Sequence, residues 1–265
     1  MSLDENLGPG KSATATGNRA AQPALDAGAN AITPLLSPMP GVMLWWCALD
    51  APAAALPALE ALLSDAERNR AARFGTAALR ERYVVGRASL RRVLGAMLGL
   101  PPAGVPIVRG ERGRPRLGPG DGHGDDAGGG AGAGTLDFNI SHTSDAAMIG
   151  VASGVRIGVD IERSDRAINV PGLARKFLSA TERSHVATLD PDGARRRVLQ
   201  LWTCKEAMSK ATGDALSAPF AELTVEVASG PRLCDGPAPY VPARWELKSA
   251  AAPEAFFATV ALWRP

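Results

Sequence analysis

Apolar and polar positions along the chain divide it into strands, helices and two segments that lack periodicity. Short apolar or alternating runs predict strands at 42–49, 135–143, 146–154 and 155–163, and a hairpin at 107–117. Apolar residues at helical spacing predict helices over 56–74, 77–98, 171–189 and 193–212. Three further runs predict the last strands at 223–229, 243–249 and 256–263.

The two segments without periodicity are rich in small and polar residues. Residues 1–40 carry too few apolar side chains to offset the entropy of ordering, so they are predicted to form a disordered leader. Residues 118–134 are about half glycine and are predicted to form a flexible loop. This loop interrupts a folded unit between two predicted strands.

The remaining chain contains the same succession of signals twice. LGAMLGLPPAGVPIV and MSKATGDALSAPFAELTV each end a helix with glycine, turn at proline and continue as a strand. We therefore predict two similar α+β halves, 41–154 and 155–265. A ligand site is expected in the cleft between them, because paired halves often bind ligands at their junction.

Composition narrows the class of protein further. The net charge of +2 is too small to indicate a nucleic-acid or membrane partner by bulk electrostatics. The first 40 residues lack the continuous apolar run of a secretory signal or a membrane span. Three widely spaced cysteines, without a CxxC pair, predict reduced thiols and a cytoplasmic protein.

The stretch GVDIE at 158–162 places two acids on a predicted strand. Alternate side chains of a strand share a face, so Asp160 and Glu162 project together while Val159 and Ile161 point into the core. A divalent cation would relieve the repulsion between the two carboxylates. A half-exposed strand with its acids in water is an equally good interpretation of this fragment alone.

The stretch LWTCKEAMSK at 201–210 is predicted to be helical, with Cys204 buried on an apolar stripe. Glu206 and Lys210 lie opposite that stripe and could be an ordinary i,i+4 ion pair. Trp202 stands at the edge of the charged face, which indicates that something covers this face, as a cleft between the two halves would do. Glu206 could then join Asp160 and Glu162 around one Mg²⁺.

Arginines gather in the first half. Between Ala66 and Arg92 there are eight arginines and two glutamates. Each arginine alone fits a solvated face, but the set, with Arg114 and His142, could bind a small polyanionic ligand.

Four motifs together resemble the 4′-phosphopantetheinyl transferases of the surfactin-synthetase-activating, two-halved, monomeric type. They are FNISHT (138–143), GVDIE (158–162), KFLSATE (176–182) and WTCKEAMSKATG (202–213). The resemblance runs from about residue 42 to the C-terminus, and the order and spacing of the last three motifs make it specific. It implies a pseudo-twofold pair of halves that binds coenzyme A and Mg²⁺ in the cleft between them.

The resemblance also implies roles for individual residues. Asp160, Glu162 and Glu206 would be metal ligands, and Lys205 and Lys210 would contact the pyrophosphate. Lys210 would assist the leaving phosphate, and Glu206 would also be a general base. The 3′-phosphate and adenine would be held by residues of the SHT, GRASLRR and GRP motifs, and Arg70 would add to the phosphate site: Arg70, Arg87, Gly113, Arg114, Pro115, Ser141 and His142.

The implied reaction transfers 4′-phosphopantetheine from coenzyme A to a serine hydroxyl of an apo acyl or peptidyl carrier protein. It releases 3′,5′-ADP and requires Mg²⁺, in fatty-acid, polyketide or nonribosomal peptide biosynthesis. A Mg²⁺-dependent hydrolase of a nucleotide pyrophosphate such as coenzyme A would use the same acids and lysines. A non-enzymatic polyanion-binding protein is less favoured, because few aromatic residues lie among the arginines.

Overall fold

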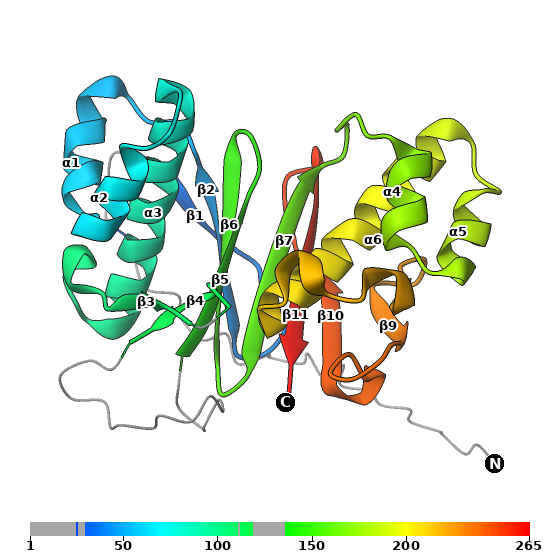
Figure 1. Ribbon diagram of the computed structural model, residues 1–265. Coiled ribbons are helices and arrows are strands. Elements are labelled where there is room, and N and C mark those ends of the chain that lie inside the picture. The colour runs from blue at the N-terminus through cyan, green and yellow to red at the C-terminus, as the bar shows by residue number, and fades with distance from the viewer. Residues whose placement is uncertain (1–24, 26–29, 111, 119–135) are drawn as a thin grey trace, which may run out of the picture.

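The structure, a computed structural model, describes residue 25 and residues 30–110, 112–118 and 136–265. The N-terminal half contains β1 (Ile32–Leu35), β2 (Val42–Ala48), α1 (Leu56–Ala61), α2 (Asp65–Ala71), α3 (Ala77–Leu98), β3 (Ile107–Arg109), β4 (Pro115–Leu117), β5 (Leu136–His142) and β6 (Ala146–Ser153). The C-terminal half contains β7 (Arg156–Arg163), α4 (Val170–Phe177), α5 (Ala180–Val186), α6 (Pro191–Thr212), β8 (Thr224–Glu226), β9 (Arg232–Asp235), β10 (Trp245–Ser249) and β11 (Phe256–Trp263). Strands occupy the middle of the molecule, with α1–α3 on one side and α4–α6 on the other (Figure 1).

The central sheets of the two halves have the same strand order. In the first sheet β2 pairs with β6 and β6 with β5; in the second β7 pairs with β11 and β11 with β10. All four pairings are antiparallel, and each sheet is covered by one 22-residue helix, α3 or α6. The predicted α+β fold of two similar halves is confirmed, and the repeated order supports a pseudo-twofold relation between them.

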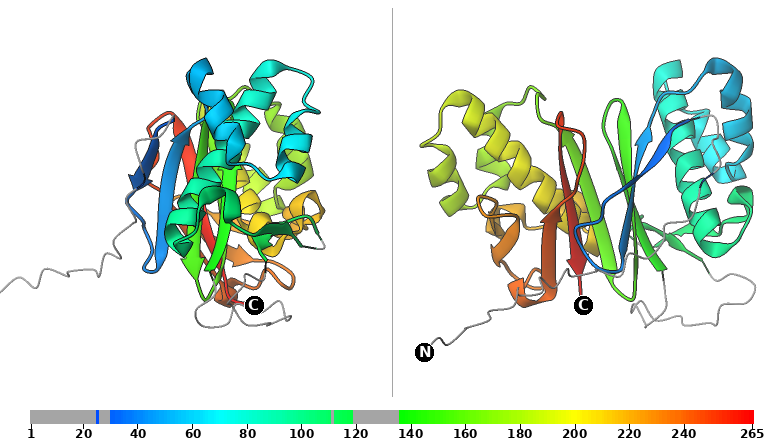
Figure 2. Two further views of the ribbon diagram at one scale, coloured as in Figure 1. Left: turned by 90° about the vertical axis from the view of Figure 1, so that its left-hand side faces the viewer. Right: turned by 180° about the vertical axis from the view of Figure 1, so that it is seen from behind.

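An apolar core fills the space between the two sheets. Val159 and Ile161 of β7 belong to it, together with Leu44 of β2, so the predicted inward face of GVDIE is confirmed. The long helices cover the opposite faces of their sheets. The layers therefore run helix, sheet, sheet, helix, as two further views show (Figure 2).

The two sheets also meet edge to edge, where β5 lies beside β7. Side chains at alternate positions of β5 accept hydrogen bonds from backbone N–H groups of β7. The acceptors and donors are Asp137 Oδ2 and Ile157 N at 2.8 Å, Asn139 Oδ1 and Val159 N at 3.0 Å, and Ser141 Oγ and Ile161 N at 3.2 Å. Because buried N–H groups of a strand edge need acceptors, these three side chains join the halves.

Helix α6 approaches β7 so closely that only glycine fits beneath it. A Cβ atom at Gly158 would lie 1.9 Å from the carbonyl oxygen of Ala207 and 2.7 Å from the backbone nitrogen of Ala211. The glycine of GVDIE therefore lets the backbone of α6 rest directly on the strand that carries the two acids.

Two predicted helices are each divided in two by an N-cap. The segment 56–74 separates into α1 and α2, and 171–189 separates into α4 and α5. Each second helix begins with a capping box, in which a serine and a glutamate bond each other's backbone N–H groups, Ser64 with Glu67 and Ser179 with Glu182. The helical structure predicted over both segments is therefore confirmed, but the breaks at the two serines were not predicted.

The predicted leader extends too far into the chain. Residues 32–35 form β1, which pairs with the outer edge of β2 through Ile32–Cys47 to Leu35–Leu44. The rest of the predicted leader up to residue 29, apart from residue 25, lies outside the described residues, as does nearly all of the predicted loop 118–134. Strand β9 was also missed, and it pairs with β8.

Within the part of the chain that the structure describes, no helix is both long enough and apolar enough to cross a membrane.

Replacing Gly158 with alanine tests the close packing of α6 on β7. The new methyl group would collide with the backbone of α6, so we expect the free energy of unfolding to fall by about 3 kcal/mol or more. Gly75→Ala is the control, because its Cβ would meet nothing within 4 Å and its φ is not positive. Urea unfolding measures both; equal stability of the two variants would contradict the packing.

Candidate active site

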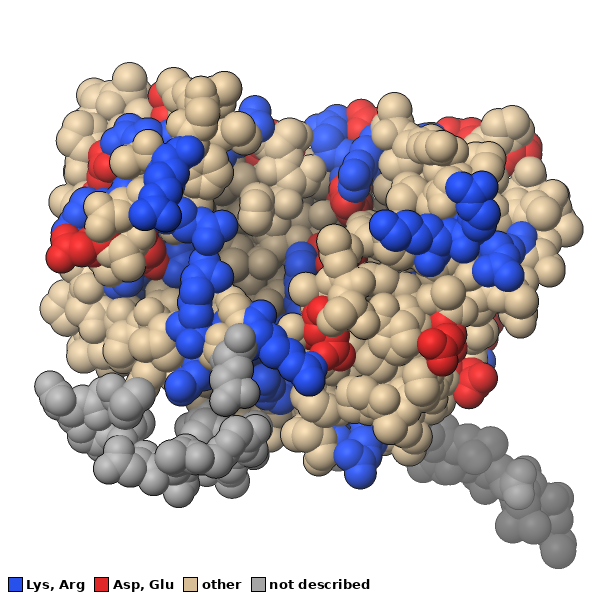
Figure 3. All heavy atoms as spheres, in the orientation of Figure 1, with Lys and Arg blue, Asp and Glu red and all other residues tan. Residues whose placement is uncertain are grey.

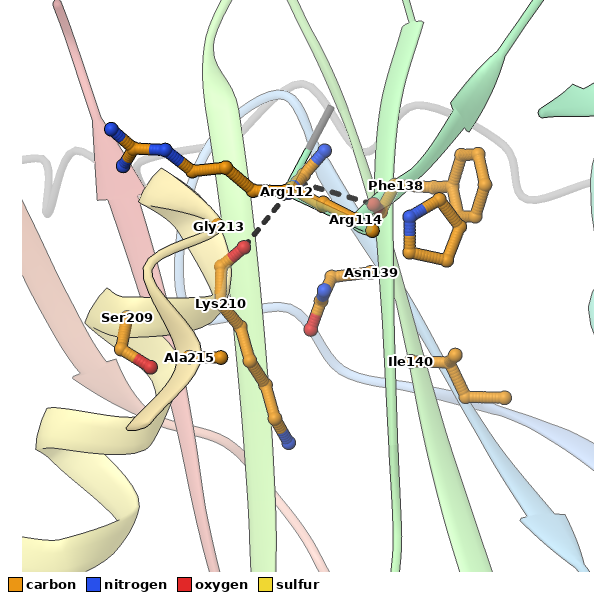
Figure 4. Close-up of a pocket in the computed structure, with 11 residues that line it drawn as sticks. Arg112, Arg114, Phe138, Asn139, Ile140, Ser209, Lys210, Gly213 and Ala215 are labelled. Atoms are coloured by element: carbon orange, nitrogen blue, oxygen red, sulfur yellow. Dashed lines mark hydrogen bonds between the residues drawn. The ribbon is translucent and has the colours of Figure 1, made fainter. Parts of the chain in front are cut away.

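A cavity of about 220 Å³ lies between the two halves. The β3–β4 turn and β5 line one side, and the end of α6 with the following turn lines the other. The lining residues are Arg112, Gly113, Arg114, Pro115, Phe138, Asn139, Ile140, Ser209, Lys210, Gly213 and Ala215. Lys210 extends along this cavity opposite Asn139 and Ile140 (Figure 4). The predicted site between the halves therefore has a corresponding cavity, and Gly113 and Pro115 lie in its wall.

Asp160 is the buried centre of a polar cluster beside this cavity. Its Oδ1 accepts hydrogen bonds from Ser141 Oγ at 2.8 Å and from Lys210 Nζ at 2.6 Å. Lys210 Nζ also donates to Ser141 Oγ at 2.9 Å. The other carboxylate oxygen, Asp160 Oδ2, is buried and has no hydrogen-bond partner. Ser141 of β5 and Lys210 of α6 thus meet at Asp160 of β7, whose Oδ2 atom remains a free acceptor.

Two further acids have raised pKa values. Burial, and after it the charge of Asp160, raises the pKa of Glu206 to about 7, although Lys210 opposes this shift. Burial also raises the pKa of Glu162, against the effect of Arg166, whose guanidinium donates to Glu162 Oε1. Asp160 adds to this rise as well. A nearby positive charge would therefore favour the ionised form of both glutamates.

The chemistry of these donors fits a hard divalent cation. Asp160, Glu162 and Glu206 offer only oxygen atoms, and the buried Oδ2 of Asp160 lacks a partner. Among the residues that the structure describes, however, no group of three or more acids, histidines or cysteines is arranged to hold a metal ion. The three acids therefore affect one another's pKa values, but their side chains are not already arranged as a metal site.

Arg114, predicted to contact the nucleotide, lies in the cavity wall and bonds mainly to other parts of the protein. Its guanidinium forms two bonds with Asp137, at 2.8 and 2.7 Å, and donates to the carbonyl oxygens of Phe138, Ile157 and Lys210. The residue is only 9% exposed. Arg114 therefore fastens the β3–β4 turn to β5, β7 and α6, and most of its five N–H donors are used within the protein.

Lys205 is also placed differently from the sequence-based prediction. The side chain is 0% exposed, and Nζ lies 2.6–2.9 Å from Glu182 Oε2 and from the carbonyl oxygens of Phe177, Phe220 and Leu223. Burial lowers its pKa, while Glu182 opposes this shift. An ammonium group has three donors, so none remains for a ligand. The predicted contact between Lys205 and a pyrophosphate is not possible in this structure.

The SHT motif contributes two different side chains. Ser141 takes part in the Asp160 cluster and has no free donor, whereas His142 is exposed at the end of β5. Partial desolvation and then the charge of Lys210 lower the pKa of His142. The neutral ring is therefore favoured near pH 7, with Lys210 close by.

Arg70 and Arg87 lie on α2 and α3 of the N-terminal half and are not part of the cavity wall. Arg87 donates to Glu67, with its Nε at 2.9 Å, and the guanidinium of Arg70 lies 5.8 Å from the centre of the Tyr83 ring. Burial raises the pKa of Tyr83, and the positive charges of Arg87, Arg70 and Arg109 oppose this rise. Basic side chains gather on the N-terminal side of the hollow between the halves (Figure 3).

Trp202 and Cys204 belong to the core of the C-terminal half. The indole ring of Trp202 packs 4.6 Å from the Phe177 ring and 5.6 Å from the Phe220 ring, measured between centroids. The sequence predicted the cleft between the halves as the cover of this face, whereas Trp202 packs on this aromatic cluster within the C-terminal half. Cys204 is buried with its pKa raised to about 12, so the prediction of an inert thiol is confirmed.

Sequence reasoning missed Asp137 and Asn139, which hold β7 in place. Their signal was present in DFNIS, where polar side chains at positions 137, 139 and 141 share one face of a strand. Glu182 ends the KFLSATE motif but was given no role, although its capping-box spacing from Ser179 was readable.

Comparison with known proteins gives a consistent result. Residues 156–254 match the model of the 4′-phosphopantetheinyl transferase superfamily. The 4′-phosphopantetheinyl transferase HetI of Nostoc sp. is 34% identical over 176 residues, which cover 66% of this chain and 70% of that protein. A putative 4′-phosphopantetheinyl transferase of Synechocystis sp. is 28% identical over 68% of each chain.

A shorter match reaches 4′-phosphopantetheinyl transferase Sfp of Bacillus subtilis, which is 34% identical over 34% of this chain and 39% of that protein. The match to HetI covers more than two thirds of that relative, and the family match spans β7, α6 and the acids on them. The chain therefore belongs to the 4′-phosphopantetheinyl transferase family.

Proposed function

We propose that this chain transfers the 4′-phosphopantetheine group of coenzyme A to a serine hydroxyl of an apo acyl or peptidyl carrier protein. The observation that carries the proposal is the Asp160–Ser141–Lys210 cluster beside a cavity between the halves, in a member of this family. Both halves supply residues to this site within one chain, which supports a monomeric enzyme. The described cysteines are all free thiols, which supports the cytoplasm as its location.

Coenzyme A would lie in the cleft with its nucleotide end in the cavity. The turn at Gly113 and Pro115 and the half-buried Ile140 offer walls for a planar base. The ammonium group of Lys210 would meet the pyrophosphate, because it is 26% exposed and its two present bonds are to a site acid and a serine. The basic N-terminal side would attract the phosphates.

Asp160 and Glu206, with Glu162, would hold a Mg²⁺ ion. The orphaned Oδ2 of Asp160 and the raised pKa values of the two glutamates support this assignment. When bound, the ion would neutralise charge that develops on the pyrophosphate.

The transfer forms one bond and breaks one. The serine oxygen of the carrier bonds to the β-phosphorus, and the bond from that phosphorus to the oxygen shared with the α-phosphate breaks, releasing 3′,5′-ADP. Lys210 Nζ stabilises the charge on the departing phosphate and can supply its proton. Glu206, with a pKa of about 7, is suited to take the serine proton at its carboxylate.

Incubation with coenzyme A, Mg²⁺ and apo carrier domains tests this function, with the mass of the carrier as the readout. We expect the carrier to gain one phosphopantetheine group. Loss of coenzyme A without any gain in carrier mass would instead indicate a pyrophosphate hydrolase. Absence of transfer to every acyl and peptidyl carrier tested would contradict the proposal.

Asp160→Asn and Glu206→Gln test the acids of the site. We expect each to lower kcat by about 100-fold or more, because each removes charge at the reacting phosphates. Asp165→Asn is the matched control, since this acid comes just after the same strand but is 64% exposed and pairs with Arg163. Circular dichroism would verify folding; wild-type turnover in Asp160→Asn would contradict the assigned role.

The raised pKa of Glu206 predicts how stability depends on pH without divalent cations. The folded state keeps the Glu206 proton up to about pH 7, whereas the unfolded chain releases it near the ordinary value of 4.5. The free energy of unfolding should therefore fall as pH rises through this window, by about 3 kcal/mol at most from this group. Thermal melts in EDTA from pH 4.5 to 8 measure the fall.

Mg²⁺ should raise the melting temperature more at pH 8 than at pH 5, because it stabilises the ionised acids. Glu206→Gln should flatten both dependences, and Glu222→Gln, an exposed acid of the same half, should change neither. An equal response to Mg²⁺ at both pH values would count against the cation site.

A further inference from the structure

Lys205, directly before Glu206, is the centre of a buried network that joins five segments of the C-terminal half. Its Nζ bonds the end of α4, the first turn of α5 and two carbonyl groups around the 3-10 helix Phe220–Glu222. Glu182 extends the network, because its Oε1 accepts from the backbone N–H of Val225 at 2.8 Å. The turn of α6 that carries Glu206 is therefore bonded, through Lys205 and Glu182, to α4, α5, the 3-10 helix and β8.

The N-terminal half contains an equivalent network without an acid beside it. Arg91 is 2% exposed, bonds the capping-box glutamate Glu67 at 2.6 Å, and donates to three carbonyl oxygens of the segment after α3. Arg91 and Lys205 each lie eight residues before the left-handed glycine that ends their helix, Gly99 or Gly213. The same device thus occurs twice in the fold.

The two copies differ in the residue that comes directly after the buried cation. Arg92 succeeds Arg91 and donates to Asn30 Oδ1 at 3.1 Å, within the N-terminal half. Glu206 succeeds Lys205 and interacts with Asp160 and Lys210. In the C-terminal half, the buried lysine therefore fixes the same turn of α6 that carries the site acid Glu206.

The other end of the same helical segment is fixed from the opposite side. Arg114 of the N-terminal half donates through Nε to the carbonyl oxygen of Lys210 at 2.8 Å (Figure 4). Between residues 205 and 210, α6 is therefore held by one buried cation behind it and another in front.

We propose that Lys205 and Glu182 are positioning residues, which set the location of Glu206 relative to Asp160 and do not contact coenzyme A. The inference rests on the proposed function for the role of Glu206. It explains why a lysine with no exposed surface and no free donor lies next to the site acid. A shift of about 1 Å in a reacting group can cost about 100-fold in rate, so a displaced α6 turn is sufficient to impair turnover.

The test compares Lys205→Met with Arg91→Met, which removes the equivalent cation in the half without the acids. Both variants should lose stability in urea, because each leaves a buried glutamate with fewer partners. Lys205→Met should lower kcat by about 10- to 100-fold and leave the calorimetric dissociation constant for coenzyme A within about twofold. Arg91→Met should leave kcat within about twofold.

Lys205→Arg is the milder variant, since Arg91 shows that a guanidinium can make the same set of contacts. It should recover most of the lost turnover. Amide hydrogen exchange over residues 201–212 gives a readout without turnover: exchange should be faster in Lys205→Met than in wild type and unchanged in Arg91→Met.

Three results would overturn the inference. The first is that weaker coenzyme A binding accounts for the lost activity of Lys205→Met. The second is an equal loss of kcat in Arg91→Met, and the third is unchanged hydrogen exchange over 201–212 in Lys205→Met. The exchange comparison does not depend on transfer. A wild-type protein that modifies no carrier would count against the proposed function alone.

Discussion

The hydrogen bonds from β7 to the side chains of β5 are the contact on which the rest of the structure depends. Two sheets of the same topology would each leave an edge with unsatisfied N–H groups. Here the edge of β7 is satisfied by Asp137, Asn139 and Ser141, and the last of these also belongs to the Asp160 cluster. The junction of the halves and the candidate site are thus parts of one hydrogen-bond system.

This arrangement explains why the site needs both halves. Asp160 and Lys210 come from the C-terminal half, and Ser141 and the cavity wall at Gly113 come from the N-terminal half. Gly158 brings α6 onto the same strand from the other side, so all of these groups converge. The two halves share their topology and a buried ion pair between a cation and a capping-box glutamate, Arg91 with Glu67 and Lys205 with Glu182. Only the second half carries the three candidate site acids, which lie on β7 and α6.

Much of the fold could be predicted from periodicity, because each element has a local signal. The helix 77–98 agrees with α3, and the inward face of GVDIE agrees with the core. The divisions at Ser64 and Ser179 were missed, although their SxxE spacing was visible. Strand β1 was assigned to the leader because it is four residues long and takes its stability from pairing with β2.

The candidate site was less predictable, since charge alone does not show which side of a helix a lysine faces. Lys205 lies four residues after the buried Leu201 and is itself buried, whereas Lys210 reaches the cleft. Arg114 could likewise bind a phosphate, but its guanidinium bonds the carboxylate of Asp137. Asp137 lies 23 residues away along the chain, so no local pattern predicts this pairing. The acids were predictable because strand alternation fixes their face, and Asp160 indeed shares β7 with Glu162.

One site spanning both halves should use the unpartnered oxygen of Asp160, and a crystal structure of the protein with coenzyme A and Mg²⁺ tests this arrangement. We expect the nucleotide in the cavity between β5 and α6, the pyrophosphate at Lys210 Nζ, and the ion bound by Asp160 Oδ2. A nucleotide bound outside this cavity, or an ion held without Asp160, would contradict this assignment of the site.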